Sequence, residues 1–191
     1  QRAPSPLRAP SPVPRVPSPV PLSPEEPPRA DAALAADLSE VLSPLASEAA
    51  IVVDPVLSAT AGGMEPGGAL VAAYLEHLMP LAALVTPNTP ELEALAGGDP
   101  AALLAAGAAA VLHKGGHGAG REAVDELWSG GSKTRWPRPR LDCGPVRGTG
   151  CALASAVASH VARGAALSDA CGRAGDWLAS LLEGLAPRSD G

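Results

Sequence analysis

Three short runs of aliphatic residues, each broken off by a polar residue beside proline or glycine, constrain the fold of this chain most strongly. They span residues 51–53, 84–85 and 109–112, and segments with helical spacing of apolar residues separate them. Strands that alternate with helices build a mostly parallel sheet. Strands that are apolar throughout are typical of a sheet covered on both faces. The sequence therefore predicts an α/β fold with helices on both faces of the sheet.

The helices and one hairpin can also be placed from the sequence. The first helix is expected from Asp31, with an apolar face formed by Leu34, Leu38, Val41 and Leu45. Further helices are expected from about residues 68, 90, 101, 149 and 168. Between residues 124 and 136, a Ser-Gly-Gly-Ser stretch separates two strand-like runs, which predicts a β-hairpin.

Residues 1–30 differ from the rest of the chain because they hold 11 of its 22 prolines. Each proline lacks an amide donor and biases the preceding residue toward extended structure, so neither a helix nor a sheet can propagate. We expect a disordered segment, with two alternatives: a ligand for a proline-recognising module, or a segment that is not native coding sequence. Residues 31–191 are expected to form one partial domain.

Composition argues against several classes of function. The formal net charge is −6, and aromatic residues are limited to three Trp and one Tyr, which is unlike a nucleic-acid-binding surface. No uncharged run reaches the roughly 18 apolar residues of a membrane span. The three cysteines show no paired spacing for disulfides or zinc, which favours a reducing, cytoplasmic compartment.

Polar residues follow each of the three predicted strands, at the edge where an open α/β sheet binds its ligands. These are Asp54, Asn88 and Lys114, and a Gly-Thr-Gly-Cys stretch at 148–151 opens a later helix. Free amides at a helix start favour an anion such as a phosphoryl group. A carboxylate, an ammonium group and such a helix end together indicate a phosphoryl-transfer site.

The same segments, at 51–57, 86–91, 111–117 and 148–151, stand in the order seen in hydroxymethylpyrimidine/phosphomethylpyrimidine kinases. The chain resembles this thiamine-pathway branch of the ribokinase-like superfamily over about residues 31–185. The resemblance implies ATP-dependent phosphorylation of hydroxymethylpyrimidine and its monophosphate. Sugar kinases of the superfamily and most pyridoxal kinases end the glycine motif in Asp, whereas this motif ends in Cys151.

The resemblance also implies residue roles in catalysis. The amides of Gly148, Thr149 and Gly150 with Cys151 would form the anion hole for the transferred phosphate. Cys151 would be the catalytic base that faces the substrate hydroxymethyl group. Because a helix N-terminus lowers the pKa of a thiol, we expect Cys151 to be partly ionised.

Nucleotide and Mg²⁺ binding are implied for a second group of residues. Lys114 would neutralise nucleotide phosphate charge together with Gly148 and Gly150, and Asn88 and Glu91 match an Asn-x-x-Glu motif that organises Mg²⁺ and its waters. Asp54 would join Glu91 as a metal ligand, since Mg²⁺ is commonly held by few carboxylates and several waters.

Each of these residues also has a purely structural interpretation. Asp54 could end a strand, and Lys114 could be a solvated loop residue. Asn88 and Glu91 could cap the next helix, and Cys151 could be a buried small side chain. The basic stretch at 133–140 could lie near nucleotide phosphates, although a solvated hairpin is the favoured interpretation.

The resemblance is incomplete at the N-terminus and before the glycine motif. The early strands that supply most pyrimidine contacts in the family are missing, and Arg147 stands where the family usually has His. A ribokinase-like sheet without its first strands exposes apolar surface, so we expect a marginally stable chain or one that needs a partner. The formation of a homo-oligomer is one possible way to cover this surface. A pyridoxal kinase-like vitamin kinase and a non-catalytic nucleotide-binding or interaction domain are the alternative functions.

Overall fold

The computed structural model describes residues 31–57, 68–117, 120–141, 143 and 146–185. The proline-rich segment 1–30, for which the sequence predicts disorder, lies outside the described residues. All expected strands and helices of the ordered part fall within them.

The described strands form one five-stranded sheet in the order β1-β2-β3-β4-β5. Its first three strands are parallel, with Val53 opposite Val85 and Val85 opposite Val111. The last two form an antiparallel hairpin that pairs with the third strand. The bounds are β1 Val52–Val53, β2 Leu84–Val85, β3 Ala110–His113, β4 Glu122–Ser129 and β5 Ser132–Pro139.

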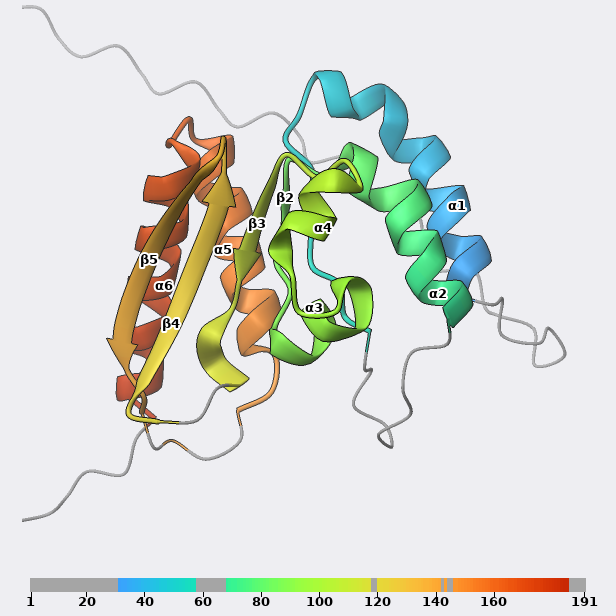
Figure 1. Cartoon of the computed structure of the whole chain (residues 1–191). Helices are drawn as coiled ribbons and strands as arrows, with labels where there is room; N and C mark the ends of the chain where they lie inside the picture. The colour runs from blue at the N-terminus through green and yellow to red at the C-terminus, as the bar shows by residue number, and fades with distance from the viewer. Residues whose placement is uncertain (1–30, 58–67, 118–119, 142, 144–145, 186–191) are drawn as a thin grey trace, which may run out of the picture.

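Helices cover both faces of the sheet, as the sequence predicts. In Figure 1, α5 and α6 lie behind the sheet, and α1 to α4 lie on its other side. No helix among the described residues is long and apolar enough to cross a bilayer. The α-helices are α1 Asp31–Leu42, α2 Gly68–Ala73, α3 Thr89–Ala96, α4 Pro100–Ala105, α5 Thr149–Ala162 and α6 Leu167–Glu183; a π-turn spans Tyr74–Leu78 and 3-10 turns span Ser43–Ser47, Met79–Leu81 and Gly115–His117.

Two apolar cores form because successive side chains of a strand point to opposite faces of the sheet. Val85 and Val111 pack with α2, α3 and α4 in one core. Leu84 and Leu112 pack with α5 and α6 in the other. The strand runs are therefore buried on both faces, and this burial fixes where each strand ends and its polar residue begins.

The apolar stripe of α1 does not face a core. Leu34, Leu38, Val41 and Leu45 are between 44% and 66% exposed, whereas Ala35 on the other side of the helix is buried. Helix α1 therefore packs against the molecule through its alanine side. This exposure agrees with the expectation that residues 31–191 leave apolar surface uncovered.

Candidate functional site

The ends of the three parallel strands bring polar residues to one edge of the sheet. Asp54 directly follows β1, and Thr86 directly follows β2. The backbone pairing continues one step beyond the strands, since Asn88 and Lys114 form a parallel bridge and the Lys114 amide donates to Pro87 O at 2.8 Å. This edge is the one at which the sequence predicts a ligand site.

Lys114 lies at the centre of this edge. Its Nζ donates to Asp54 Oδ1 at 2.7 Å and lies 3.7 Å from Glu91 Oε2. The Lys114 side chain is only 9% exposed, so the interpretation as a solvated loop lysine is wrong. Residues 54, 91 and 114 therefore meet in space although 60 positions of sequence separate the first from the last.

Asp54 accepts a second hydrogen bond, from Thr86 Oγ1 at 2.9 Å. Burial is the largest single influence on the pKa of Asp54 and raises it, but the lowering contacts, of which the Lys114 hydrogen bond and charge come first, together hold the pKa below its usual value. Contacts with Cys151 and Thr86 lower this pKa further. Asp54 is therefore a carboxylate at neutral pH, and it holds the Lys114 ammonium in place.

Asn88 and Glu91 form a reciprocal cap at the start of α3. Asn88 Oδ1 accepts from the Glu91 amide at 2.9 Å, and Glu91 Oε2 accepts from the Asn88 amide at 2.7 Å. This is the capping box, which satisfies two amides of the helix start. The structural interpretation of the pair is therefore confirmed. Their roles in nucleotide and Mg²⁺ binding stay predictions, and the same Glu91 carboxylate also faces Lys114.

The start of α5 reaches the same place from the other side of the sheet. Gly148 precedes the helix in a left-handed conformation, with φ of 81°. A Cβ built at Gly150 would lie 3.0 Å from Lys114 Nζ, so glycine at this position lets the helix approach the lysine. The free amides of a helix start and an ammonium group are thus adjacent, which suits an anion.

Cys151 lies exposed in the first turn of α5, against Asp54. Its hydrogen bond with the Asp54 carboxylate, together with burial and the negative charge of Asp54, raises the pKa of the thiol; Lys114 opposes this shift. The expectation of a partly ionised Cys151 is therefore wrong for the nucleotide-free chain. The carboxylate that contributes most to this shift belongs to Asp54, which directly follows β1 and lies 97 positions earlier in the sequence.

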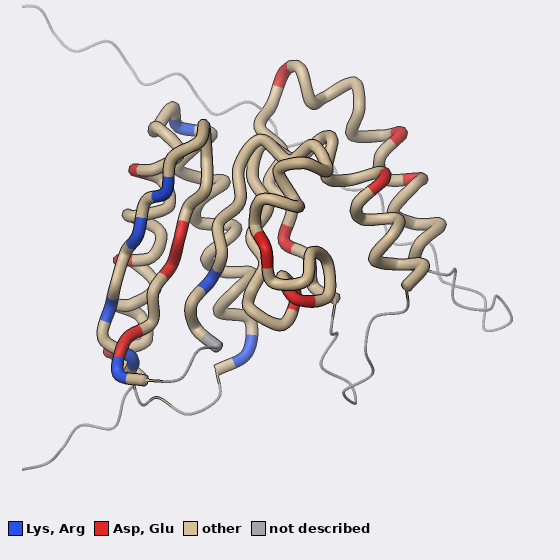
Figure 2. Tube along the Cα trace, in the orientation of Figure 1, with Lys and Arg blue, Asp and Glu red and all other residues tan. Residues whose placement is uncertain are grey.

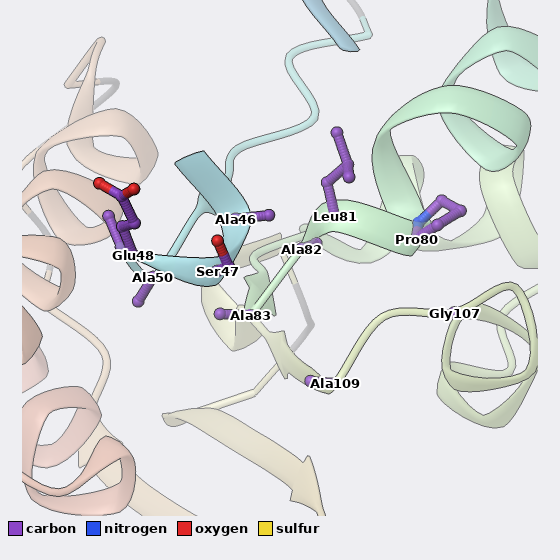
Figure 3. A pocket seen from close by; sticks show the side chains of 11 residues that line it. Ala46, Ser47, Glu48, Ala50, Pro80, Leu81, Ala82, Ala83, Gly107 and Ala109 are labelled. Atoms are coloured by element: carbon purple, nitrogen blue, oxygen red, sulfur yellow. The ribbon is translucent and has the colours of Figure 1, made fainter. Parts of the chain in front are cut away.

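A cavity of about 320 Å³ opens beside these residues, between β1 and α5. Asp54 and Cys151 lie at one end, and Val52, Val56, Ala154 and Ala158 line most of the rest. A larger cavity of about 480 Å³ lies at the opposite, amino ends of the strands (Figure 3). Among the described residues that line it, Glu48 is the only ionisable one, so the smaller cavity is the candidate site.

Sequence reasoning missed Thr86 and Asp125 as parts of this site. Thr86 is buried and bonds to Asp54, while Asp125 accepts from the Gly115 amide, which directly follows Lys114. The sequence places Thr86 directly after the second predicted strand and Asp125 within the predicted hairpin, without indicating a functional role for either. The available signal for Thr86 was its position as a polar residue between the apolar run 84–85 and Pro87.

The described residues hold no group of three or more His, Cys, Asp or Glu side chains that could bind a metal ion. Asp54 and Glu91 instead place one carboxylate each beside Lys114. Two carboxylates are too few for an all-protein metal cage, but Mg²⁺ that keeps waters and binds phosphate oxygens needs only one or two.

Comparison with known sequences identifies relatives of the chain. The sequence model of the family described as phosphomethylpyrimidine kinase matches residues 30–189. A hydroxymethylpyrimidine/phosphomethylpyrimidine kinase from Rhizobium meliloti is 41% identical over 138 residues, which are 66% of this chain and 52% of that protein. The corresponding kinase from Escherichia coli is 34% identical over 69% of this chain and 54% of that protein. The chain thus spans about half the length of these curated relatives.

Solved structures share the fold. A phosphomethylpyrimidine kinase from Clostridium difficile superposes with a TM-score of 0.64 at 26% identity, over 79% of this chain and 64% of that one. An ADP complex of a Bacillus subtilis pyridoxal kinase superposes with a TM-score of 0.65 at 27% identity, over 74% of this chain and 58% of that one. The expected ribokinase-like α/β fold is therefore confirmed.

Proposed function

The chain belongs to the phosphomethylpyrimidine kinase family, and from this premise we propose that it carries the phosphoryl-transfer half of an ATP-dependent kinase. The proposed substrates are hydroxymethylpyrimidine and its monophosphate, and the products are ADP and the phosphate ester of the substrate hydroxymethyl group. The observation that supports this most strongly is the contact of Lys114 with Asp54 beside the start of α5.

We propose that nucleotide phosphates bind at the Lys114 ammonium and at the amides of Gly148, Thr149 and Gly150. Lys114 is held by carboxylates rather than by solvent, so it is oriented before a nucleotide arrives. An oriented cation and fixed amides stabilise phosphoryl transfer because they need no reorganisation as charge moves. Asn88 lies at the same edge of the sheet, where its backbone pairs with that of Lys114, and we propose that it contacts the nucleotide.

The proposal assigns Mg²⁺ to Asp54 and Glu91, the two carboxylates that flank Lys114. When bound together with the nucleotide, the ion would neutralise part of the negative charge of the phosphates. The donor set fits this ion, because carboxylate oxygens are hard ligands and two of them leave room for water and phosphate. In the nucleotide-free chain, Lys114 balances the same negative charge.

Cys151 is the proposed acceptor for the proton of the substrate hydroxyl group. In this reaction the hydroxyl oxygen forms a bond to the γ-phosphorus, the bond from that phosphorus to the bridging oxygen of ADP breaks, and the hydroxyl proton passes to the Cys151 thiolate. Because the pKa of the thiol is raised without ligand, only a minor fraction is thiolate at neutral pH. Turnover should therefore increase with pH until Cys151 is ionised.

A pyridoxal kinase-like activity is the second candidate, since solved pyridoxal kinases share the fold. Cys151 disfavours it, because most pyridoxal kinases carry Asp at this motif position by the resemblance described above. A non-catalytic role is the third candidate, favoured by Arg147 in place of the usual His and by the exposed apolar stripe of α1.

The three candidates are separated by one assay on the whole 191-residue chain. Hydroxymethylpyrimidine, its monophosphate and pyridoxal are each incubated with ATP labelled at the γ-phosphate, and labelled product is measured. We expect transfer to the pyrimidines, lost in Lys114→Met and Cys151→Ala and kept in Arg135→Met, which changes an exposed residue of the hairpin. Transfer to pyridoxal alone supports the second candidate. ATP binding without transfer to any acceptor supports the third, and a folded chain that binds no ATP refutes the proposal.

A further inference from the structure

Arg140, directly after β5, holds the backbone of a segment made of residues 115–116 and 120–122, which lie between the end of β3 and the first residue of β4. Its guanidinium donates to four carbonyl oxygens of this segment, and its own amide donates to a fifth, that of Arg121, at 2.8 Å. The four are Gly116 O at 2.6 Å, Gly120 O at 3.0 Å, Glu122 O at 3.2 Å and Gly115 O at 3.3 Å.

These contacts use the guanidinium almost completely. Of its five N–H groups, Nε bonds Gly120, one hydrogen of Nη1 bonds Gly116, and Nη2 bonds both Gly115 and Glu122. A phosphate that bound Arg140 would have to displace carbonyl oxygens. Arg140 is therefore a half-buried residue bound to backbone carbonyls, a role that neither the solvated-hairpin nor the phosphate interpretation of the sequence anticipates.

Asp125, on β4, holds the same segment from the other side. Its Oδ1 accepts from the Gly115 amide at 3.0 Å, and its Oδ2 accepts from Arg138 Nη1 at 3.0 Å. Arg138 in turn donates to Gly172 O and to Asp176 Oδ1 of α6, each at 3.0 Å. Both backbone polar groups of Gly115 are thus bound, its N–H to Asp125 and its C=O to Arg140.

The segment also has no room to shift toward β4. A Cβ at Gly115 would overlap the carbonyl of Val124, and a Cβ at Gly175 of α6 would overlap the Arg138 guanidinium. Figure 2 shows the setting of these contacts, with basic positions along β5 beside acidic positions along β4. The Arg138 side chain is 13% exposed and that of Arg135 is 60% exposed, so the hairpin has one partly buried and one solvated arginine.

We propose that Arg140, assisted by Asp125, is a positioning residue that sets the affinity of the chain for a nucleoside triphosphate. By fixing Gly115 and Gly116, it fixes the adjoining Lys114, whose ammonium must stay between Asp54 and the start of α5. This inference rests on the proposed function, because it assumes that phosphates bind at Lys114. A lysine cannot replace Arg140, since three N–H groups on one nitrogen cannot span four carbonyls spread from 115 to 122.

The test compares Arg140→Lys and Arg140→Met with the matched control Arg135→Lys in the full chain. Hydrogen exchange of the amides between 113 and 124 is measured without nucleotide, and KM for ATP and kcat are measured with a saturating pyrimidine substrate. We expect both Arg140 variants to exchange faster in this segment and to raise KM for ATP about tenfold or more, with kcat changed by less than about twofold. Arg135→Lys should change neither quantity.

Two results would overturn the inference. If Arg140→Lys restored the wild-type KM for ATP while Arg140→Met did not, the role would be charge alone. If exchange between 113 and 124 were unchanged in both variants, Arg140 would not position the segment. Should the Arg140 variants not fold, Asp125→Asn serves instead, because its NH2 group replaces one of the two accepting oxygens and would face either the Gly115 amide or the Arg138 guanidinium, which are both donors. Unchanged exchange at Gly115 would then overturn the role of Asp125. A wild-type chain that binds no ATP refutes the proposed function, and the exchange data still decide the positioning role.

Discussion

The ammonium nitrogen of Lys114 lies 2.7 Å from Oδ1 of Asp54, so a single ion pair joins the end of β3 to the end of β1 across the intervening β2. The same nitrogen lies 3.7 Å from Glu91 Oε2. The Lys114 ammonium thus lies beside two largely buried carboxylates. We expect the same group to contribute both to the stability of the fold and to the proposed binding of phosphate.

Replacing Lys114 by Met should remove the ammonium group that pairs with the Asp54 carboxylate. We expect the free energy of unfolding at pH 7 to fall by about 3 kcal/mol, since breaking a buried ion pair leaves an uncompensated charge. Urea denaturation measures this loss. Adding Asp54→Asn to the variant should recover part of it, and a single Lys114→Met variant as stable as wild type would contradict the ion-pair interpretation.

The thiol of Cys151 should react slowly with iodoacetamide at pH 8, because its pKa is raised and only the thiolate reacts. Asp54→Asn removes the carboxylate whose hydrogen bond is the largest cause of the raised pKa, so alkylation at residue 151 should become faster at the same pH. Mass spectrometry of the modified peptides measures each cysteine separately.

Cys171 provides the internal control for this experiment. Burial raises its pKa to about 12, so it should stay unmodified in the folded chain. If wild-type Cys151 reacted as fast as free cysteine, the helix N-terminus would dominate after all, as the sequence led us to expect.

His113 should make the fold less stable as the pH falls below 6.5. Its ring is half-buried, and burial lowers its pKa, while Glu126 and Asp125 partly oppose this shift and Lys133 adds to it. The unfolded chain therefore takes up this proton at a higher pH than the folded chain does. The free energy of unfolding is highest above the unfolded pKa and decreases as the pH falls through 6.5 toward the folded pKa.

The variant His113→Gln tests this dependence. Glutamine can still bond to Thr89 Oγ1, which lies 3.0 Å from the histidine Nε2, but it does not titrate. Urea midpoints at pH 7.5 and 5.5 should differ less in the variant than in wild type. An equal difference in both proteins would show that His113 does not contribute.

The sequence predicts where the three parallel strands end to within one residue, since β1 and β2 end at Val53 and Val85 as expected and β3 ends at His113, one residue later. A polar residue beside proline or glycine follows each aliphatic run. The two hairpin strands extend beyond the expected limits of 124 and 136. Because Asp54, Asn88 and Lys114 each follow a parallel strand, their meeting at one edge was predictable as well.

Contacts between distant segments could not be predicted in the same way. The pKa of Cys151 depends on Asp54, and the role of Arg140 depends on carbonyl oxygens that carry no sequence signature. Likewise, helical spacing shows which residues of α1 share a face, but not what that face meets. In the structure, Ala35 packs against the core, and the leucines of the stripe lie exposed.

The exposed stripe of α1 makes a prediction about stability and association. Changing Leu34 and Leu38 to Gln should alter the free energy of unfolding by less than about 0.5 kcal/mol per residue, because both side chains are already in contact with solvent. Self-association, measured by sedimentation, should decrease. Leu103→Ala is the contrast: its side chain is fully buried, and its truncation should cost about 2–5 kcal/mol. A large loss in the Leu34 and Leu38 variant would mean that another part of the chain covers the stripe.

Glycine at position 150 should matter for binding and not for folding. A Cβ there would lie 3.0 Å from Lys114 Nζ and 3.7 Å from its Cε, so Gly150→Ala must push the ammonium away from the start of α5. Alanine favours helix over glycine by up to about 1 kcal/mol, so the melting temperature should stay equal or increase. ATP affinity, measured by calorimetry, should decrease.

Gly68→Ala is the matched control, since this glycine also begins a helix but has open space around it. Because the expected changes in stability and affinity have opposite signs, general damage to the fold cannot imitate them, and unchanged ATP affinity in Gly150→Ala would show that phosphates do not bind between Lys114 and α5.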